Sequence, residues 1–320
     1  MGSIHLRIWK TNPDVEVVGI YDEDRAKSLE MATQYETKSF GSVDELITSC
    51  DCVTIAVPTS LHFDIAIKCI KAGLHCFIEK PITAQYAEAV ALLAEAEKHD
   101  VLIQVGHVER FNPALVALRP YRLEPLFAEV HRLARFTPRA TDVSVVHDLM
   151  IHDIDLILWL IKSKVKNIEA NGVAILTDTP DIANARLTFE NGAVANLTSS
   201  RMSAHPMRKL RIFQKNAYFS IDFANQDVEV YRIDENALPG ESSIPAQMLG
   251  TIEAGKKNRH IYFEHPTVLP VNAIEDEQKS FIGAIRGEHP VTVSGYDGSV
   301  ALQIAEQINT IVLKNIAGTL

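Results

Sequence analysis

Helix and strand patterns alternate along the first 106 residues, and this alternation limits the possible folds more than any other feature of the sequence. The run DCVTIAVP at 51–58 is almost wholly apolar, which is typical of a strand buried on both faces of a sheet. The expected helices cover 3–11, 23–34, 42–47, 60–72 and 84–99, and the expected strands cover 15–21, 51–58, 75–80 and 101–106. Strands that alternate with helices predict βαβ units, and therefore a doubly wound α/β domain with a parallel sheet.

The second part of the chain shows a different pattern. A helix expected at 145–161 is followed by segments in which apolar residues alternate with polar ones, and no helix separates these segments. Such strands are expected at 165–175, 182–189, 193–202, 209–214, 217–222 and 228–233, with a loop or short helices at 239–260 and helices at 273–286 and 297–315. The stretch ENGAV at 190–194 predicts a hairpin with a type I′ turn. We therefore expect a dinucleotide-binding domain over 1–117 and an α+β domain with a mostly antiparallel sheet over 118–320.

Charge and hydropathy exclude several classes of partner. The formal net charge of −10 argues against nucleic acid and anionic membranes, although 206–215 carries a local excess of Lys and Arg. The sequence has no apolar run near the roughly 18 residues of a membrane span and no signal-peptide pattern, so we expect a cytoplasmic protein. The four cysteines lie in apolar patterns without a CxxC pair, and we expect reduced thiols: Cys50, Cys52, Cys69 and Cys76.

The opening MGSIH resembles the end of a phosphate-binding turn that begins a helix. Asp22 follows an expected strand twenty residues after Gly2, which is about the spacing from a Gly-rich turn to the acid that binds an adenosine ribose. A complete fingerprint has a preceding strand and two more glycines, which this sequence does not contain. We therefore expect a gap in the sheet or a substitute strand, weak NAD binding, no bound dinucleotide in a structure, and a true start upstream.

Two groups of residues suggest chemistry on their own. EKP at 79–81 follows an expected parallel strand, at the end of the sheet where such folds bind ligands, so Lys80 is either a site residue or a surface lysine. Asp148 and His152 are four residues apart on an apolar helix and therefore share a face. The pair is a general base with its orienting carboxylate, a structural pair whose polar groups bond to each other in a buried helix, or part of a metal site.

Four stretches together resemble the Gfo/Idh/MocA-type oxidoreductases. These are GSIH with the strand that ends at Asp22, AVPTSLHFDIAIKCIKAGLHCFIEKPIT at 56–83, GHVERFNP at 106–113 and HDLMIHDIDLILWL at 147–160. The last two look most similar to bacterial and archaeal members that oxidise the 3-hydroxyl of UDP-N-acetylglucosamine. The resemblance implies a Rossmann-type domain, which here lacks its first strand, and an NAD-dependent dehydrogenase that acts on a sugar or nucleotide sugar. The alternatives are a non-catalytic sugar or NAD sensor, or a form with impaired cofactor binding.

The resemblance also implies which residues form the site. Lys80, Asp148 and His152 are expected to be catalytic, with His152 as base and Lys80 as donor to the substrate oxygen, or with these two roles exchanged. The cofactor, NAD rather than NADP, is expected at Gly2, Ser3, Ile4, Asp22, Pro58, Thr59, His62, Glu79 and Lys80. The nearby Arg25 favours the alternative cofactor, NADP. The substrate is expected at His107, Arg110, Asn112 and Arg201, no metal is expected, and the apolar C-terminal sheet predicts a homodimer or homotetramer.

Overall fold

The computed structural model describes residues 1–137, 143–234, 246–254 and 257–318. It divides into two compact units. Unit 1 combines Met1–Val108 with Asn272–Gln303, and unit 2 combines Glu109–Val271 with Ile304–Leu320. The expected division was a single cut after residue 117. The observed units differ because the chain returns to unit 1 near its end, where it supplies the helix Ala273–Ile285, and a cut based on pattern alone misses such a return.

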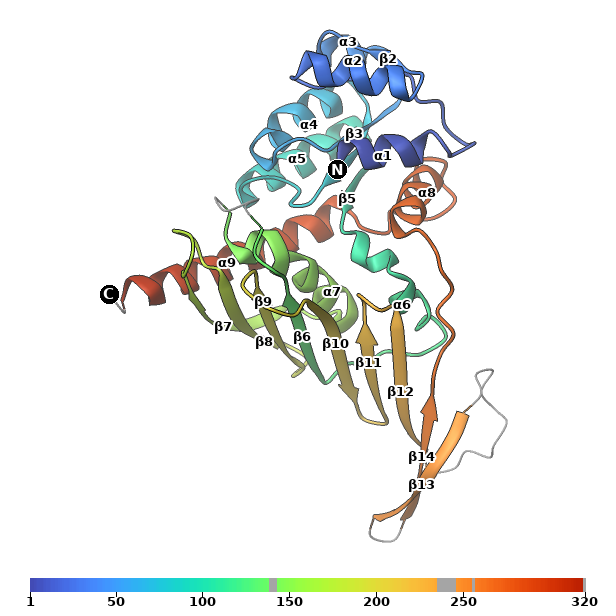
Figure 1. Cartoon of the computed structure of the whole chain (residues 1–320), viewed down its shortest axis with the longest axis vertical. Coiled ribbons are helices and arrows are strands. Elements are labelled where there is room, and N and C mark those ends of the chain that lie inside the picture. Colours follow the sequence, from blue (N-terminus) through green and yellow to red (C-terminus); the bar gives the residue numbers. More distant parts are fainter. Residues whose placement is uncertain (138–142, 235–245, 255–256, 319–320) are drawn as a thin grey trace. The chain divides into compact units, whose positions relative to one another are not determined.

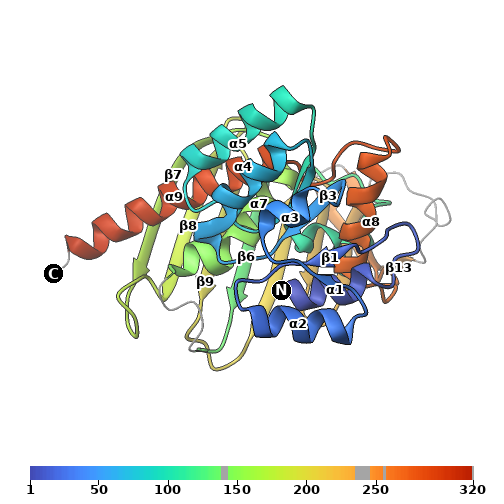
Figure 2. The ribbon, with the colours of Figure 1, turned by 90° about the horizontal axis from the view of Figure 1, so that it is seen from above.

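Unit 1 is an α/β unit with parallel strands, as the sequence predicts. Its elements in order are α1 (Gly2–Trp9), β1 (Gly19–Ile20), α2 (Arg25–Gln34), β2 (Lys38–Ser39), α3 (Val43–Ile47), β3 (Cys52–Ile55), η1 (Thr59–Leu61), α4 (His62–Lys71), β4 (His75–Glu79), α5 (Tyr86–His99), β5 (Ile103–Gly106), α8 (Ala273–Ile285) and the first part of α9 (Gly295–Ala317). The helices α4 and α5 lie side by side in Figures 1 and 2. The described strands form two separate parallel sheets, β1-β2 and β3-β4-β5. The described strands of unit 1 are therefore divided between two sheets, in agreement with the expected gap.

Local sequence signals explain where these helices begin and end. Asp24 caps α2 by accepting hydrogen bonds from the Ala26 and Lys27 amides, and Ser42 caps α3. The helix α4 ends before Gly73, whose φ of +82° is the left-handed conformation that favours glycine. Each cap satisfies backbone groups that a helix end leaves without partners, so the boundaries lie close to those expected.

The core of unit 1 joins the sheet to α1 and α8. Phe77 of β4 and Phe281 of α8 are fully buried and meet edge to face, with ring centroids 5.9 Å apart. Trp9 of α1 packs on the same cluster and donates from its indole nitrogen to Thr54 of β3 at 2.9 Å. All four cysteines are free thiols. The N-terminal helix and the late helix α8 are therefore parts of one core.

Unit 2 is built on a nine-stranded sheet of order β13-β14-β12-β11-β10-β6-β9-β8-β7, which Figure 1 shows as a fan. The strands are β6 (Phe127–Leu133), β7 (Val165–Val173), β8 (Ile182–Phe189), β9 (Val194–Ser200), β10 (Met207–Gln214), β11 (Ala217–Asp222), β12 (Asp227–Asp234), β13 (Ala246–Ala254) and β14 (Lys257–Glu264). All neighbours pair antiparallel except β6 and β9, which are parallel. The mostly antiparallel sheet is confirmed.

Two details of unit 2 differ from the sequence-based expectation. The segment expected as a loop or short helices over 239–260 contains β13 and the first half of β14, while 239–245 and 255–256 lie outside the described residues. The hairpin at 190–194 is present, but its turn is not type I′, because Gly192 has a positive φ (+86°) and Asn191 does not. The Gly192 amide donates to Phe189 O at 3.0 Å and the Phe189 amide to Ala193 O at 2.9 Å. This pattern fits a three-residue loop with a bulge at glycine.

The helical segment of unit 2 packs on one face of this sheet. The helix α7 (Ile151–Ile161) contacts β6 and β9, and a turn of π-helix, η3 (Val146–Met150), precedes it. The sequence predicts one α-helix over 145–161, whereas the structure begins it with this wider turn. Single π turns inside helices are frequent at functional sites. Asp148 belongs to this turn.

Candidate active site

The Lys80 segment of unit 1 follows directly from β4. This strand ends at Glu79, at the carboxyl end of a parallel sheet, and the Lys80–Pro81 peptide bond is cis. Both ring nitrogens of His62 face backbone oxygens, with Nδ1 2.8 Å from Pro81 O and Nε2 3.0 Å from Val57 O. The buried imidazole of His62 therefore ties the turn after β4 to the segment after β3.

Glu79 is a buried carboxylate at the base of the same turn, with 8% of the residue exposed. Its Oε1 lies 2.6 Å from His5 Nε2 in α1, and its Oε2 accepts a hydrogen bond from the Lys80 amide at 3.3 Å. A Cβ added at Gly106, at the end of β5, would lie 3.2 Å from the Glu79 carboxylate. Glycine at 106 thus allows β5 to approach Glu79 closely.

The acid that follows β1 is Asp22, as expected for a ribose-binding position. Its hydrogen bond from Lys27 at 2.8 Å is the main reason that the pKa of Asp22 is lowered. The pKa of Lys27 is raised by the same bond. Arg25 donates to Ser39 Oγ at 2.9 Å and to the backbone oxygen of Phe40. Asp22 is therefore a carboxylate at neutral pH, and the Arg25 guanidinium already has partners in unit 1.

Residues expected at the cofactor occupy the strand ends and helix starts of unit 1. Gly2, Ser3 and Ile4 form the first turn of α1, Pro58 and Thr59 follow β3, Glu79 ends β4 and Lys80 follows it. Helix N-termini and the carboxyl ends of parallel strands are where open α/β sheets bind dinucleotides. The backbone amides of the first turn of α1, together with the Asp22 carboxylate, fit the chemistry of an NAD(P) site.

Asp148 and His152 both lie in unit 2, half-buried, in the π turn and in the first turn of α7. The neighbouring acids of α7 have different surroundings. Asp153 pairs with Arg132 of β6 through bonds of 2.8–3.0 Å, and Arg132 also donates to Glu109 at 2.9 Å. Burial raises the pKa of Asp153, and Arg132 opposes that effect. These ion pairs hold the helix that carries Asp148 and His152.

Three of the four residues expected at the substrate have partners within unit 2. Arg110 forms two bonds with Asp155, of 2.8 and 2.6 Å, and Asn112 caps the short helix α6 (Pro113–Val116) and donates to Glu109. Arg201 lies 3.6 Å from Asp181 and donates to the backbone oxygens of Val143 and Pro180. The structure therefore uses these side chains as anchors. The fourth, His107, is buried in unit 1 just after β5.

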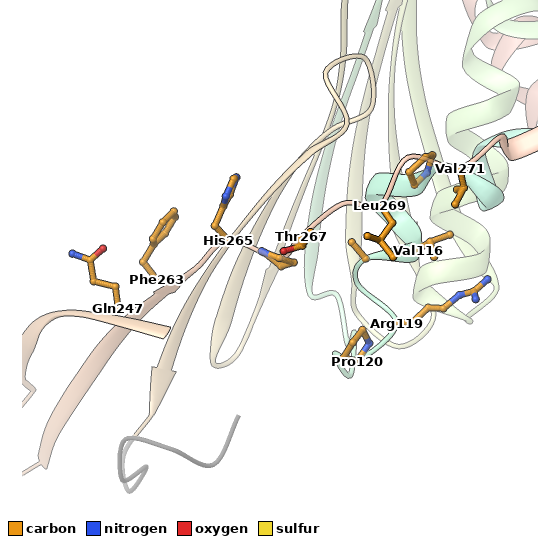
Figure 3. A pocket seen from close by; sticks show the side chains of 12 residues that line it. Val116, Arg119, Pro120, Gln247, Phe263, His265, Thr267, Leu269 and Val271 are labelled. Atoms are coloured by element: carbon orange, nitrogen blue, oxygen red, sulfur yellow. The ribbon is translucent and has the colours of Figure 1, made fainter. Parts of the chain in front are cut away.

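Unit 2 also contains a groove of about 750 Å³ that none of the expected site residues lines. Figure 3 shows its side chains, which come from α6 and the turn after it, from β13, and from the end of β14 with the segment that follows. Most of the lining is apolar: Pro113, Val116, Ala117, Pro120, Phe263, Pro266, Leu269 and Val271, with Arg119, Gln247, His265 and Thr267 as the polar members.

Sequence reasoning missed several residues of these networks. Gln278 of α8 and Arg132 of β6 are buried polar residues with defined partners. A polar residue at a position that the helical or strand period assigns to the buried face is the signal that would have found them. Within the described ranges, no group of three or more His, Cys, Asp and Glu residues could hold a metal, and no helix is long and apolar enough to cross a membrane.

Comparison with known protein families decides the class of the chain. Residues 1–107 match the oxidoreductase family with an NAD-binding Rossmann fold, and residues 117–220 match the GFO/IDH/MocA C-terminal domain. The chain belongs to the Gfo/Idh/MocA oxidoreductases. This membership confirms the resemblance drawn from the EKP and DLMIH segments, and it confirms a dehydrogenase with an NAD(P)-binding domain.

Individual members of the Gfo/Idh/MocA family are similar over nearly the whole chain. UDP-N-acetylglucosamine 3-dehydrogenase of Acidithiobacillus ferrooxidans is 36% identical over 298 residues, which cover 93% of this chain and 90% of that protein. A solved structure of that enzyme has a TM-score of 0.86 at 34% identity and covers 97% of this chain and 94% of its own. Myo-inositol 2-dehydrogenase of Thermotoga maritima is 24% identical and covers 94% of this chain and 90% of its own.

Proposed function

We propose that this protein oxidises a hydroxyl of a sugar or nucleotide sugar with NAD, and that its substrate is UDP-N-acetylglucosamine, oxidised at the 3-position. The observation that carries the proposal is the 36% identity to a UDP-N-acetylglucosamine 3-dehydrogenase over 93% of the chain. The identity to the inositol dehydrogenase is 24% over a similar length. The presence of Lys80, Asp148 and His152 supports catalysis over a purely sensory role.

The side chains supply the proton chemistry that such an oxidation needs. His152 removes the proton of the substrate hydroxyl, and the Asp148 carboxylate fixes the imidazole tautomer and stabilises the imidazolium. Lys80 donates to the same oxygen and stabilises the negative charge that develops on it. Bound NAD supplies the acceptor for the hydride that leaves the carbinol carbon. The roles of Lys80 and His152 can also be exchanged, with Lys80 as the proton acceptor.

The cofactor proposal is NAD rather than NADP. The ionised Asp22 carboxylate accepts hydrogen bonds from a ribose diol and repels a 2′-phosphate. Arg25, the nearby cation that favours NADP, is engaged with Ser39 and Phe40. The contacts that occupy Arg25 support the preference for NAD.

The substrate proposal includes His107, Arg110, Asn112 and Arg201. The ion pairs of Arg110 and Arg201 support an indirect role for these two, in which each holds a backbone segment beside the substrate. The position of His107 directly after β5, at the carboxyl end of a parallel strand, supports a direct role.

The purified chain, NAD and a panel of substrates test the proposal through the absorbance of reduced nicotinamide. The panel contains UDP-N-acetylglucosamine, UDP-glucose, free N-acetylglucosamine and myo-inositol, and NADP replaces NAD in a parallel series. We expect the highest kcat/KM with UDP-N-acetylglucosamine and NAD. If NAD is reduced with myo-inositol and with no other member of the panel, the proposed substrate is wrong. If NAD is reduced with no member of the panel, the proposed enzymatic function is wrong.

A further inference from the structure

A chain of hydrogen bonds in unit 1 runs from α8 to the backbone of Lys80. Gln278 of α8 donates from Nε2 to His5 Nδ1 at 3.0 Å and to the His5 backbone oxygen at 3.2 Å. His5 Nε2 lies 2.6 Å from Glu79 Oε1, and Glu79 Oε2 accepts from the Lys80 amide at 3.3 Å. Gln278, His5 and Glu79 all belong to unit 1 and are buried.

The donors and acceptors in this series of hydrogen bonds leave one consistent position for the proton of the His5 ring. A side-chain amide nitrogen only donates, so His5 Nδ1 must accept from Gln278 and carry no proton. The proton of the neutral imidazole is then on Nε2, where it is donated to Glu79. Gln278 thus selects the His5 tautomer that binds the Glu79 carboxylate. The His5 ring is also held edge to face against Phe77, at a centroid distance of 5.2 Å.

The turn that contains Lys80 is consequently held on both sides. On one side Glu79 is fixed by His5, and on the other the Pro81 carbonyl oxygen lies 2.8 Å from His62 Nδ1. Glycine at 106 leaves room for the Glu79 carboxylate in this position, since an added Cβ would lie 3.2 Å from it. A buried carboxylate costs free energy unless it is paired or hydrogen-bonded, and in this turn His5 and the Lys80 amide supply those partners.

We propose that His5 and Gln278 are positioning residues that hold Glu79 and thereby set the backbone of Lys80. This proposal rests on the proposed function, in which Lys80 contacts the reacting oxygen. A catalytic group displaced by about 1 Å can lose roughly a hundredfold in rate, so an anchor at the first backbone atom of Lys80 affects turnover more than it affects binding. Because Gln278 lies in α8, this late helix contributes to the positioning of Lys80 through His5 and Glu79.

The experiment compares His5→Leu, which removes the donor to Glu79, with His5→Gln, which keeps a side-chain amide donor of similar reach. Gln278→Leu is a milder variant that leaves His5 in place. The matched control is Gln104→Leu, because Gln104 is also a buried glutamine that bonds to α8, through Glu277 O at 2.8 Å. Circular dichroism and thermal unfolding establish that each variant is folded at the assay temperature.

Two readouts are measured for every variant. The first is kcat and KM with UDP-N-acetylglucosamine and NAD. The second is the hydrogen-exchange rate of the Lys80 amide in the protein alone, which requires neither cofactor nor substrate. For His5→Leu we expect kcat to fall at least about tenfold with KM changed less than about threefold, and the Lys80 amide to exchange about tenfold faster. His5→Gln is expected to recover most of both losses, and Gln104→Leu to resemble the wild type.

The outcomes separate this inference from the proposed function. If folded His5→Leu protects the Lys80 amide as the wild type does, or if Gln104→Leu lowers kcat as much as His5→Leu, the positioning role is wrong. If the wild type reduces no NAD with any sugar, the proposed function fails, and the exchange measurement still decides whether His5 holds the Lys80 backbone.

Discussion

At the scale of single residues, Lys80 is the position where removal of one functional group has the sharpest expected effect. Lys80→Met keeps the length of the side chain and removes the ammonium group, so we expect turnover to fall by about 10²–10⁴-fold, as for loss of a proton-transfer group. NAD binding, measured by calorimetry, is expected to stay within about threefold, because the ammonium acts mainly in the transition state. The matched control is Lys98→Met, whose ammonium is exposed and pairs with Glu95 in the same unit. Turnover of Lys80→Met within threefold of the wild type would make Lys80 a structural residue.

Asp22 carries the expected preference for NAD at the same scale. Asp22→Ser removes the carboxylate and its bond to Lys27, so the repulsion of a 2′-phosphate disappears and Lys27 becomes available to one. We expect the ratio of kcat/KM for NAD to that for NADP to fall by at least about tenfold, which corresponds to about 1.4 kcal/mol. Glu23→Gln, at an exposed neighbour, is the control and should leave the ratio unchanged. An unaltered ratio in Asp22→Ser would assign cofactor selection to other residues.

At the scale of elements, buried ion pairs anchor the helix that carries Asp148 and His152. Arg132→Met leaves Asp153 buried without its cation and leaves Glu109 with Arg208 alone, at 3.5 Å, and loss of one partner of such a network typically costs about 3–5 kcal/mol. We expect that loss in the free energy of unfolding by denaturant titration, together with a lower kcat from a displaced α7. Arg211→Ala breaks a half-exposed pair with Glu129 in the same sheet and is expected to cost less than about 1 kcal/mol. Equal losses in the two variants would refute the anchoring role.

Elements also show how far the sequence could predict this fold. The helices and strands with a regular apolar period, such as α4 and β8, lie close to their expected bounds. The strand β6 was not expected, because its buried side chains are Ala128, Val130 and Arg132, and the arginine breaks the apolar alternation. The hairpin of β13 and β14 was missed for a related reason: Met248 and Ile252 of β13 are about half exposed, so no period marks a buried face. In both cases the strand lacks a regular alternation of buried apolar and exposed polar residues, which is the signal that sequence analysis uses.

For the candidate site too, the sequence indicates some of the residues and not their partners. Lys80 and Asp22 could be proposed from the sequence because they stand at the ends of strands, and the chain order of a parallel sheet fixes where those ends lie. The partners of Arg110 and Arg201 were not found, because Asp155 and Asp181 meet them only through the fold. The bond from Gln278 to His5 joins residues at opposite ends of the chain, and no local spacing indicates it.

At the scale of the whole molecule, a row of aromatic rings crosses the sheet of unit 2. Phe127, Phe213, Tyr218, Tyr231 and Phe263 lie on five neighbouring strands, β6, β10, β11, β12 and β14. Successive ring centroids are 4.7–5.7 Å apart. The alternate side chains of these strands, such as Ile212, Phe219 and Val230, are buried and form the core on the opposite face. The aromatic row therefore occupies the face of the sheet away from that core.

An apolar face of this kind is expected to be covered by a second copy of the chain, which gives the predicted homodimer or homotetramer. Phe213, the second ring of the row, is 39% exposed, and Phe213→Asp places a carboxylate in the contact between copies, where desolvation opposes association. Sedimentation velocity at micromolar concentration should show an oligomer for the wild type and a shift to monomer for Phe213→Asp. Phe136→Asp, at a phenylalanine that is 41% exposed and lies outside the row, should leave the wild-type assembly intact. A monomeric wild type would refute the interface, and an oligomer unaffected by Phe213→Asp would move it to another surface.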